Sequence, residues 1–190
     1  MFYRLRRIRR LLQIRIHSEL LYEHTLQQVA WTERPDGLVV RTLKKEEVSL
    51  LKEVWPVDLD RMLKRLERGD LCFAGFINNV ICSYHWVQYT GTHFFQQAHQ
   101  YVKVEKDQGW IYHVRVADWA KGRGVNGFVY ATILSEAKRL SKSKLLIYTS
   151  ADNTSNQKGL SKCGFTITKK IVSLYFNRRY FAIFERSLKQ

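Results

Sequence analysis

The chain has 190 residues, of which 45% are hydrophobic and 13% aromatic, and its formal net charge at pH 7 is +15. This composition is typical of one folded domain and excludes an intrinsically disordered chain. No apolar run approaches the roughly 18 residues of a membrane-spanning helix, and arginines interrupt the apolar runs of residues 1–16, so we expect no typical signal peptide.

The N-terminal segment carries much of the positive charge. It contains Arg4, Arg6, Arg7, Arg9, Arg10 and Arg15, with no acidic residue among them. Its apolar residues lie on one side of a helix in part of the segment, whereas residues 13–17 alternate as in a strand. We interpret residues 1–36 as a basic extension of a domain that spans residues 37–190. A helix packed on the domain, a peripheral membrane helix and a partner-binding arm stay open for residues 1–16.

The next part of the chain alternates between strand and helix patterns. Turn residues and hydrophobic periodicity predict, in chain order, a strand over 38–43, helices over 44–54 and 59–68, and strands over 71–77 and 80–89. Asn78 and Asn79 join the last two strands, and asparagine tolerates the left-handed dihedral angles of a tight hairpin.

The second half of the chain contains a crossover. Residues 90–108 read as a loop with a bent strand around 100–104. After it the pattern predicts a strand over 110–116, a helix over 125–140, a strand over 145–150, a helix over 154–162 and a closing hairpin within 166–188. A strand, a helix and a strand within this span indicate a right-handed crossover between parallel strands.

The loop of the crossover predicts an anion site. Gly122 and Gly124 lie just before the helix, between the positive charges of Lys121 and Arg123. The first turn of a helix leaves N–H groups unpaired, and glycine lets an anion approach them. The residues after Gly124 exclude a P-loop, and the next strand does not end in the acidic residue of a dinucleotide-binding fingerprint. A helix start that uses glycine for close packing is the alternative.

Two motifs resemble one family. The run 114-VRVADWAKGRGVN-126 resembles the acyl-CoA-binding motif of the GNAT superfamily of N-acyltransferases, in which a strand leads through Arg/Gln-x-x-Gly-x-Gly/Ala into a helix. The run 153-NTSNQKGLSKCGF-165 resembles the second signature, an asparagine followed by a helix and Gly-Phe. Lys121 departs from the usual Arg or Gln, and Asn126 departs from the usual Gly or Ala. The resemblance covers 110–166 most firmly.

This resemblance implies an α/β (α+β) fold in a single domain. A mixed, mostly antiparallel sheet would contain a parallel, splayed strand pair and be flanked by helices. The implied reaction is direct transfer of an acyl group from acetyl-CoA, or another acyl-CoA, to an amine, without a metal. The residues implied to contact coenzyme A are Val114, Val116, Lys121, Gly122, Arg123, Gly124, Val125, Asn126 and Asn153.

The catalytic groups are less well marked. His113 is the first candidate for the general base, because it lies on the strand beside the implied acyl site and its unperturbed pKa of about 6.5 suits proton transfer. A histidine that only packs or binds substrate is the alternative. The tyrosine that often protonates the departing thiolate is replaced by Leu160, so Tyr148, Tyr175 or water would substitute.

The sequence leaves the acceptor open. We expect a primary amine of a small molecule, such as an amino sugar. The alternatives are a protein or RNA amine, or a catalytically silent fold that binds nucleic acid or membrane through its basic surface. A homodimer is compatible with the sequence. Cys72, Cys82 and Cys163 are odd in number and lack metal-ligand spacing, so we expect reduced thiols and a cytoplasmic protein.

Overall fold

A computed structural model describes residues 15–27, 33–96, 99–176 and 179–188. Its main sheet has eight strands in the order β10-β9-β1-β8-β7-β4-β3-β2. Only β7 and β8 are parallel neighbours, and every other neighbouring pair is antiparallel. The strands of this sheet are β1 (Arg15–His24), β2 (Leu38–Thr42), β3 (Leu71–Ile77), β4 (Val80–Gln88), β7 (Gln108–Val116), β8 (Lys144–Ser150), β9 (Thr166–Phe176) and β10 (Arg179–Ser187).

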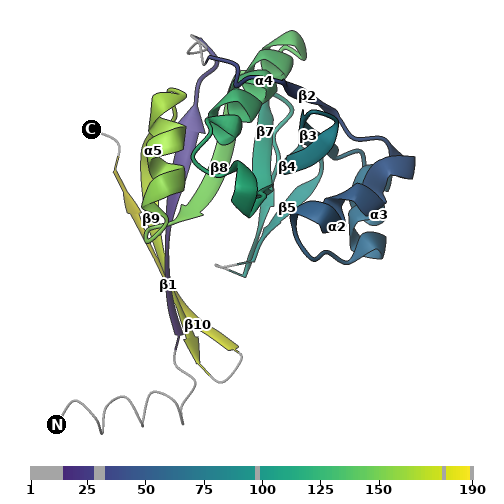
Figure 1. Ribbon diagram of the computed structural model, residues 1–190. Helices are drawn as coiled ribbons and strands as arrows, with labels where there is room; N and C mark the ends of the chain where they lie inside the picture. The colour runs from purple at the N-terminus through teal and green to yellow at the C-terminus, as the bar shows by residue number, and fades with distance from the viewer. Residues whose placement is uncertain (1–14, 28–32, 97–98, 177–178, 189–190) are drawn as a thin grey trace, which may run out of the picture.

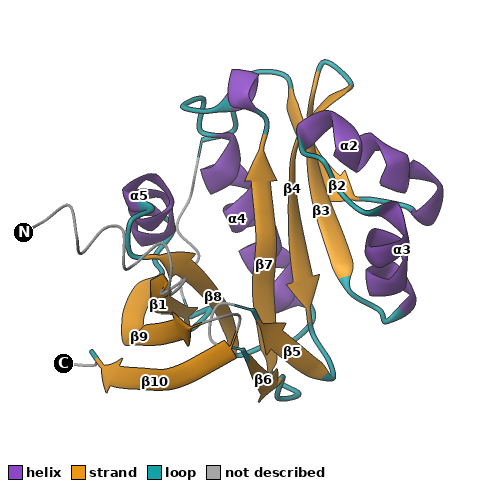
Figure 2. Cartoon of the chain, turned by 90° about the horizontal axis from the view of Figure 1, so that it is seen from below, coloured by secondary structure: helices purple, strands orange, loops and turns teal. Residues whose placement is uncertain are grey.

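Helices cover both faces of the sheet (Figures 1 and 2). One face carries α4 (Val125–Arg139) and α5 (Thr154–Lys162). The other face carries the 3-10 helix η1 (Lys45–Leu50), α2 (Leu51–Val54) and α3 (Leu59–Glu67), together with a small hairpin of β5 (Thr92–Phe95) and β6 (Gln100–Lys103). A further 3-10 helix, η2 (Asp118–Ala120), follows β7. The predicted mixed sheet with flanking helices is confirmed.

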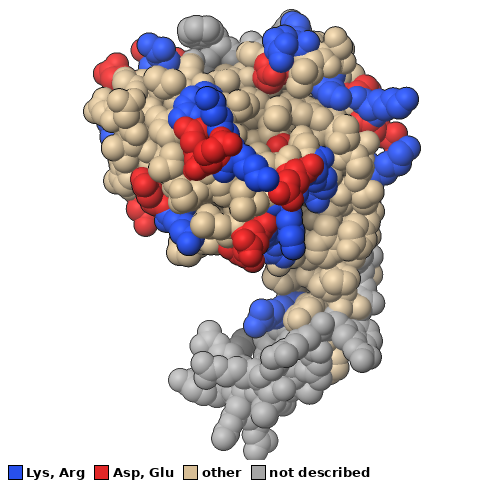
Figure 3. Space-filling view, turned by 90° about the vertical axis from the view of Figure 1, so that its right-hand side faces the viewer, with Lys and Arg blue, Asp and Glu red and all other residues tan. Residues whose placement is uncertain are grey.

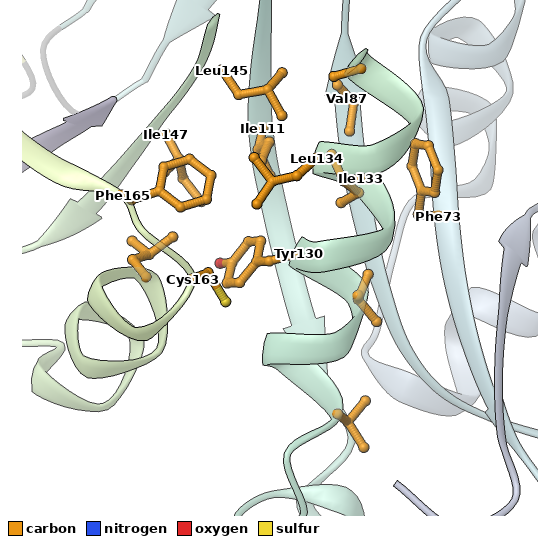
Figure 4. Close-up of a cluster of buried hydrophobic side chains, with 14 of the residues drawn as sticks. Phe73, Val87, Ile111, Tyr130, Ile133, Leu134, Leu145, Ile147, Cys163 and Phe165 are labelled. Carbon is orange, nitrogen blue, oxygen red and sulfur yellow. The ribbon is translucent and has the colours of Figure 1, made fainter. Parts of the chain in front are cut away.

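Helix α4 anchors the larger core. Its helical period places Tyr130, Ile133 and Leu134 on one face, where all three are fully buried against the sheet (Figure 4). Phe165, from the Gly-Phe pair after α5, packs against Tyr130 with ring centroids 5.9 Å apart. The Gly-Phe pair of the second motif therefore contributes to the hydrophobic core against which α4 packs.

Most local predictions hold. The asparagine turn is confirmed, since Asn78 and Asn79 have φ values of 50° and 64° between β3 and β4. The helix predicted over 44–54 is divided into η1 and α2. The loop predicted over 90–108 contains the whole β5–β6 hairpin, of which only the second strand was predicted. Four-residue strands offer too little alternation to stand out in a polar and aromatic stretch.

The N-terminal prediction needs a correction. Residues 15–24, assigned to the extension 1–36, form β1 inside the sheet, paired with β8 on one side and β9 on the other. Figure 1 shows this strand running through the sheet rather than beside it. Residues 1–14 lie outside the described residues, so the proposed membrane or nucleic-acid contacts of the basic arm stay predictions. None of the helices in the described part of the chain has both the length and the apolar content that a membrane crossing requires.

We predict that β1 is required for stability. Tyr22 is 1% exposed within the core, whereas Ile16, on the same strand, is 56% exposed. Tyr22→Ala should lower the free energy of unfolding by about 3–5 kcal/mol, because it removes a buried aromatic ring and leaves a cavity. Ile16→Ala should change it by less than about 1 kcal/mol. Urea unfolding followed by circular dichroism measures both, and equal effects would contradict the placement of β1.

Candidate functional site

The two parallel strands separate near their C-terminal ends. β7 and β8 pair from Gln108 with Lys144 to Ile111 with Ile147, and no pairing between them follows in the described chain. Beyond that point β7 stays paired with β4, and β8 stays paired with β1. Figure 2 shows β7 and β8 diverging. The predicted splayed pair is confirmed, and Val114 and Val116 lie on the length of β7 that no longer pairs with β8.

A bulge marks β7 at this opening. Tyr84 of β4 pairs with Arg115, but Trp86 pairs with Tyr112, so one residue of β4 opposes two of β7. His113 takes up the extra residue with a φ of 48°. A bulge withdraws backbone groups from the ladder and re-aims side chains. Here the carbonyl of Val114 accepts a hydrogen bond of 2.7 Å from Arg115 Nη1.

The glycine loop opens α4 at the same end of the sheet. Gly122 and Gly124 both have φ values of 76°, which glycine adopts without strain. The N–H of Phe128 donates to the carbonyl of Gly124, so the N–H groups of residues 125–127 precede the first intrahelical bond. A Cβ at Gly122 would have no heavy atom within 4 Å, and a Cβ at Gly124 would meet Pro35 Cγ at 3.6 Å. Close packing therefore does not explain these glycines, whereas the backbone conformation does.

The charged side chains of the loop are exposed. Lys121 Nζ lies 2.5 Å from Asp118 Oδ1 in an exposed ion pair, and Arg123 is exposed beside it. Neither side chain is buried in the fold, so both can turn toward a bound anion. The N–H groups that precede the first intrahelical bond, the space at the glycines and the nearby cations together fit a pyrophosphate.

Asparagines connect the two sides of the opening. Asn126 Nδ2 and the hydroxyl of Tyr130 both donate to Asn156 Oδ1, at 3.1 and 3.0 Å, and Asn156 Nδ2 donates to Thr149 Oγ1 at 3.1 Å. Asn153 Oδ1 accepts from the N–H of Asn156 and caps α5. Sequence reasoning missed Asn156. The available signal was Asn126, a polar residue where the GNAT motif usually has Gly or Ala, because such a side chain needs a hydrogen-bond partner. The cap engages one oxygen of Asn153, whose predicted contact with the pantetheine arm stays a prediction.

The environment of His113 does not favour its predicted role as the general base. Its Nδ1 lies 2.5 Å from Arg65 Nη1, and its Nε2 lies 3.3 Å from the hydroxyl of Tyr84. Because a guanidinium only donates, Nδ1 accepts and its lone pair is occupied. Burial, followed by the charges of Arg65, Arg115 and Arg61, lowers the pKa of His113 to about 3. The imidazole is therefore neutral at pH 7 but a weak and occupied proton acceptor.

The positions expected to supply a proton to the departing thiolate do not offer an accessible acid. Leu160 is fully buried in the core. Tyr148 stacks on Phe95 at 3.7 Å and on Trp110 at 5.0 Å between ring centroids, and burial raises the pKa of its hydroxyl. Tyr175 pairs with Arg15 of β1. This part of β1 lies outside the residues that pair with β8, so Tyr175 is not on the strands that line the opening.

Glu19 is a titratable group that sequence reasoning missed. It lies on β1 opposite Ser150, the last residue of β8, and is 5% exposed. Strand alternation places it on the face of Leu21, which packs with Trp110 on the side of the β5–β6 hairpin. Burial, followed by repulsion from Asp152, raises the pKa of Glu19 to about 7. The available signal was its position directly before the apolar run 20–22.

No group of three or more His, Cys, Asp or Glu in the described part of the chain is placed to hold a metal ion. The thiols of Cys72, Cys82 and Cys163 are all buried.

We predict a pH-dependent stability change at Glu19. A carboxyl with a raised pKa in the folded state binds more protons than in the unfolded state between about pH 4.5 and 7, so stability falls as pH rises through this window. Glu19→Gln removes that loss. The variant should therefore gain melting temperature over the wild type between pH 5 and 8, with little further gain above pH 8. The exposed Glu46→Gln serves as a control, and a gain for Glu19→Gln that is the same at pH 5 and 8 would contradict the raised pKa.

No family model and no curated protein matches the sequence. Solved structures do match. A GCN5-related N-acetyltransferase from Sphaerobacter thermophilus has a TM-score of 0.67 at 17% identity, over 95% of this chain and 58% of its own. A putative acetyltransferase from Salmonella typhimurium, solved with its cofactor acetyl-CoA, has a TM-score of 0.53 at 17% identity, over 69% of this chain and 80% of its own.

A third structure is a glucosamine N-acetyltransferase region of a fungal multi-domain enzyme, with a TM-score of 0.61 at 14% identity over 91% of this chain and 22% of its own. The chain spans little more than half of the Sphaerobacter protein. At these identities the likeness concerns the fold. The chain therefore has the GNAT fold.

Proposed function

We propose that the protein is an N-acyltransferase that moves an acyl group, most simply acetyl, from coenzyme A to a primary amine of a small molecule such as an amino sugar. One observation carries this proposal. The length of β7 that no longer pairs with β8 and the N–H groups at the start of α4 lie at the same end of the sheet, where the strands diverge. The fungal glucosamine N-acetyltransferase region among the similar structures supports the amino-sugar acceptor.

Each part of the opening has a role toward the donor. The N–H groups of residues 125–127 would hold the pyrophosphate, with Lys121 and Arg123 adding charge. On the side that no longer pairs with β8, the backbone of β7 at Val114 and Val116 would hydrogen-bond the pantetheine arm as an added strand does. The acyl carbonyl would then lie near the bulge, where backbone N–H groups can stabilise the oxyanion.

The amine must lose a proton. We propose that Glu19 accepts it, because its carboxyl has a pKa near 7 and lies beside the end of β8 on the face opposite α4. Since Leu160 is buried and carries no proton to give, we propose that water protonates the departing thiolate.

We predict that the donor site depends on Gly124. Gly124→Glu should weaken acetyl-CoA binding, measured by calorimetry, by at least about tenfold, because it places a carboxylate at the anion site and a side chain at a φ of 76°. Gly69→Glu is the matched control, since Gly69 also has a positive φ, 92°, and its Cβ would meet nothing within 4 Å. Folding of both variants is checked by circular dichroism. Wild-type affinity in a folded Gly124→Glu protein would exclude the proposed loop.

We predict that the pH–rate profile identifies the base. With acetyl-CoA and glucosamine as the probe acceptor, kcat/KM should rise with pH and level off near pH 7, as Glu19 ionises. Glu19→Gln should lower the plateau by about a hundredfold or more and remove this inflection. His113→Gln should keep the inflection, whatever its activity. The reverse pattern would restore His113 as the base.

A further inference from the structure

Four arginines gather around the bulge of β7. Arg61 and Arg65 lie on α3 at helical spacing, Arg68 is the C-cap residue that follows this helix, and Arg115 comes from β7. Arg65 Nη1 contacts His113 Nδ1 at 2.5 Å, and its guanidinium lies over the rings of Trp86 and Tyr112, at 5.2 and 4.9 Å. The charges of Arg115 and Arg61 also act on His113. The arginines therefore form one positively charged cluster on the face of the sheet opposite α4.

Among the described residues, only Arg68 of this cluster has a carboxylate partner. Arg68 Nε and Nη2 both donate to Asp70, and the hydroxyl of Tyr112 donates to the same buried carboxylate. Asp70 is thus already engaged. Within the described residues, no carboxylate lies at ion-pair distance from Arg61, Arg65 or Arg115.

The lack of a carboxylate at ion-pair distance from Arg65, within the described part of the chain, lowers the stability of the fold. Its guanidinium is partly buried and contacts neutral groups, namely His113, the sulfur of Met62 and two aromatic rings. Burial is the main cause that lowers the pKa of Arg65, and the charges of Arg61 and Arg68 add to it, while Tyr112 and the more distant carboxylate of Asp70 oppose it. Taking a cation out of water without a counterion destabilises the fold, and such cost is typical of sites that bind an opposite charge.

The outer surface of the same region behaves differently. On the face that carries α2 and α3, Lys and Arg side chains lie next to Asp and Glu side chains (Figure 3). Arg41 pairs with Glu47 at 2.6 Å, and Lys45 pairs with Glu67 at 3.0 Å. Carboxylates thus neutralise part of the positive charge on this outer surface, whereas none among the described residues pairs with Arg61, Arg65 or Arg115.

The cluster lies beside the reacting end of the proposed donor site. Arg115 Nη1 contacts the carbonyl of Val114, and Arg65 contacts the side chain of His113, the bulge residue before it. The guanidinium of Arg115 also lies 5.2 Å from the ring of Trp55, which is half exposed after α2. An acceptor that approaches the bulge from the side of α2 and α3 would meet these guanidinium groups first.

We propose that Arg61, Arg65 and Arg115 bind an anionic group of the acceptor, a carboxylate or a phosphate ester, so that the substrate is an amine that also carries a negative charge. Arginine is suited to this task because its planar fork of donors matches both groups. The inference rests on the proposed acyl transfer and specifies its substrate class.

The test compares matched acceptors at constant ionic strength. Glucosamine is paired with glucosamine 6-phosphate, and alaninamide with alanine, using acetyl-CoA as the donor. The wild type should favour the anionic member of at least one pair by tenfold or more in kcat/KM, and the preferred pair tells phosphate from carboxylate. Equal rates within both pairs, or faster reaction of the neutral members, would overturn the inference and leave the acyl transfer standing.

Variants locate the effect. Arg61→Gln and Arg65→Met should each lower kcat/KM for the anionic acceptor by about tenfold to a hundredfold, with a much smaller change for its neutral partner. Lys64→Gln removes a positive charge from the exposed side of the same helix and should change neither. Loss for both members of a pair alike would overturn the assignment, and the exposed Arg61 keeps the test valid if Arg65→Met fails to fold.

A direct binding measurement separates this inference from the proposed function. Calorimetry with acetyl-CoA, without any acceptor, tests the donor site alone. Calorimetry with glucosamine 6-phosphate and with alanine, without a donor, tests the arginine cluster alone. Binding of one of these that Arg61→Gln weakens would support the anion site even if acetyl-CoA did not bind. Absence of both would overturn the anion site even if acetyl-CoA bound.

Discussion

The separation of β7 from β8 is the constraint on which the site depends. The strands are held together through Ile111 and Ile147, and each then follows its other neighbour, β4 or β1. Backbone groups released from a ladder need other partners. The bulge at His113 adds to the divergence on the side of β7, and the pairing of Glu19 with Ser150 holds β8 on the other side. The opening is therefore built by neighbouring strands, whereas α4 supplies its charged end.

Local chemistry could be predicted from the sequence because its causes are local. Gly122 and Gly124 have the positive φ values that their loop requires, and α4 begins directly after them. The asparagine turn and the crossover from β7 through α4 to β8 follow from residues close in sequence. The place of β1 could not be predicted this way, because its partners β8 and β9 lie more than a hundred residues away and alternation alone does not name a partner.

The same limit applies to proton chemistry. A sequence supplies the intrinsic pKa of a side chain, but burial and distant charges decide the value in the fold. Burial and the charges of arginines, of which Arg65 comes from helix α3, lower the pKa of His113 to about 3. Burial between strands that are distant in sequence raises the pKa of Glu19 to about 7. The residue type that looked suited to accept a proton is thereby disfavoured, and a carboxyl that looked ordinary becomes suited to it.

The net charge of +15 takes on a more specific meaning in the fold. Lys121 and Arg123 lie before α4, and the arginines of α3 and β7 lie around the bulge, while α4 and α3 pack on opposite faces of the sheet. If the first group holds the pyrophosphate of the donor and the second holds an anion of the acceptor, the two substrates are fixed at their charged ends. Their neutral ends, the thioester and the amine, would then be left to meet at the bulge. Orientation of this kind lowers the entropic cost of bringing two reactants together, so the cationic groups would contribute to the rate without touching the reacting atoms.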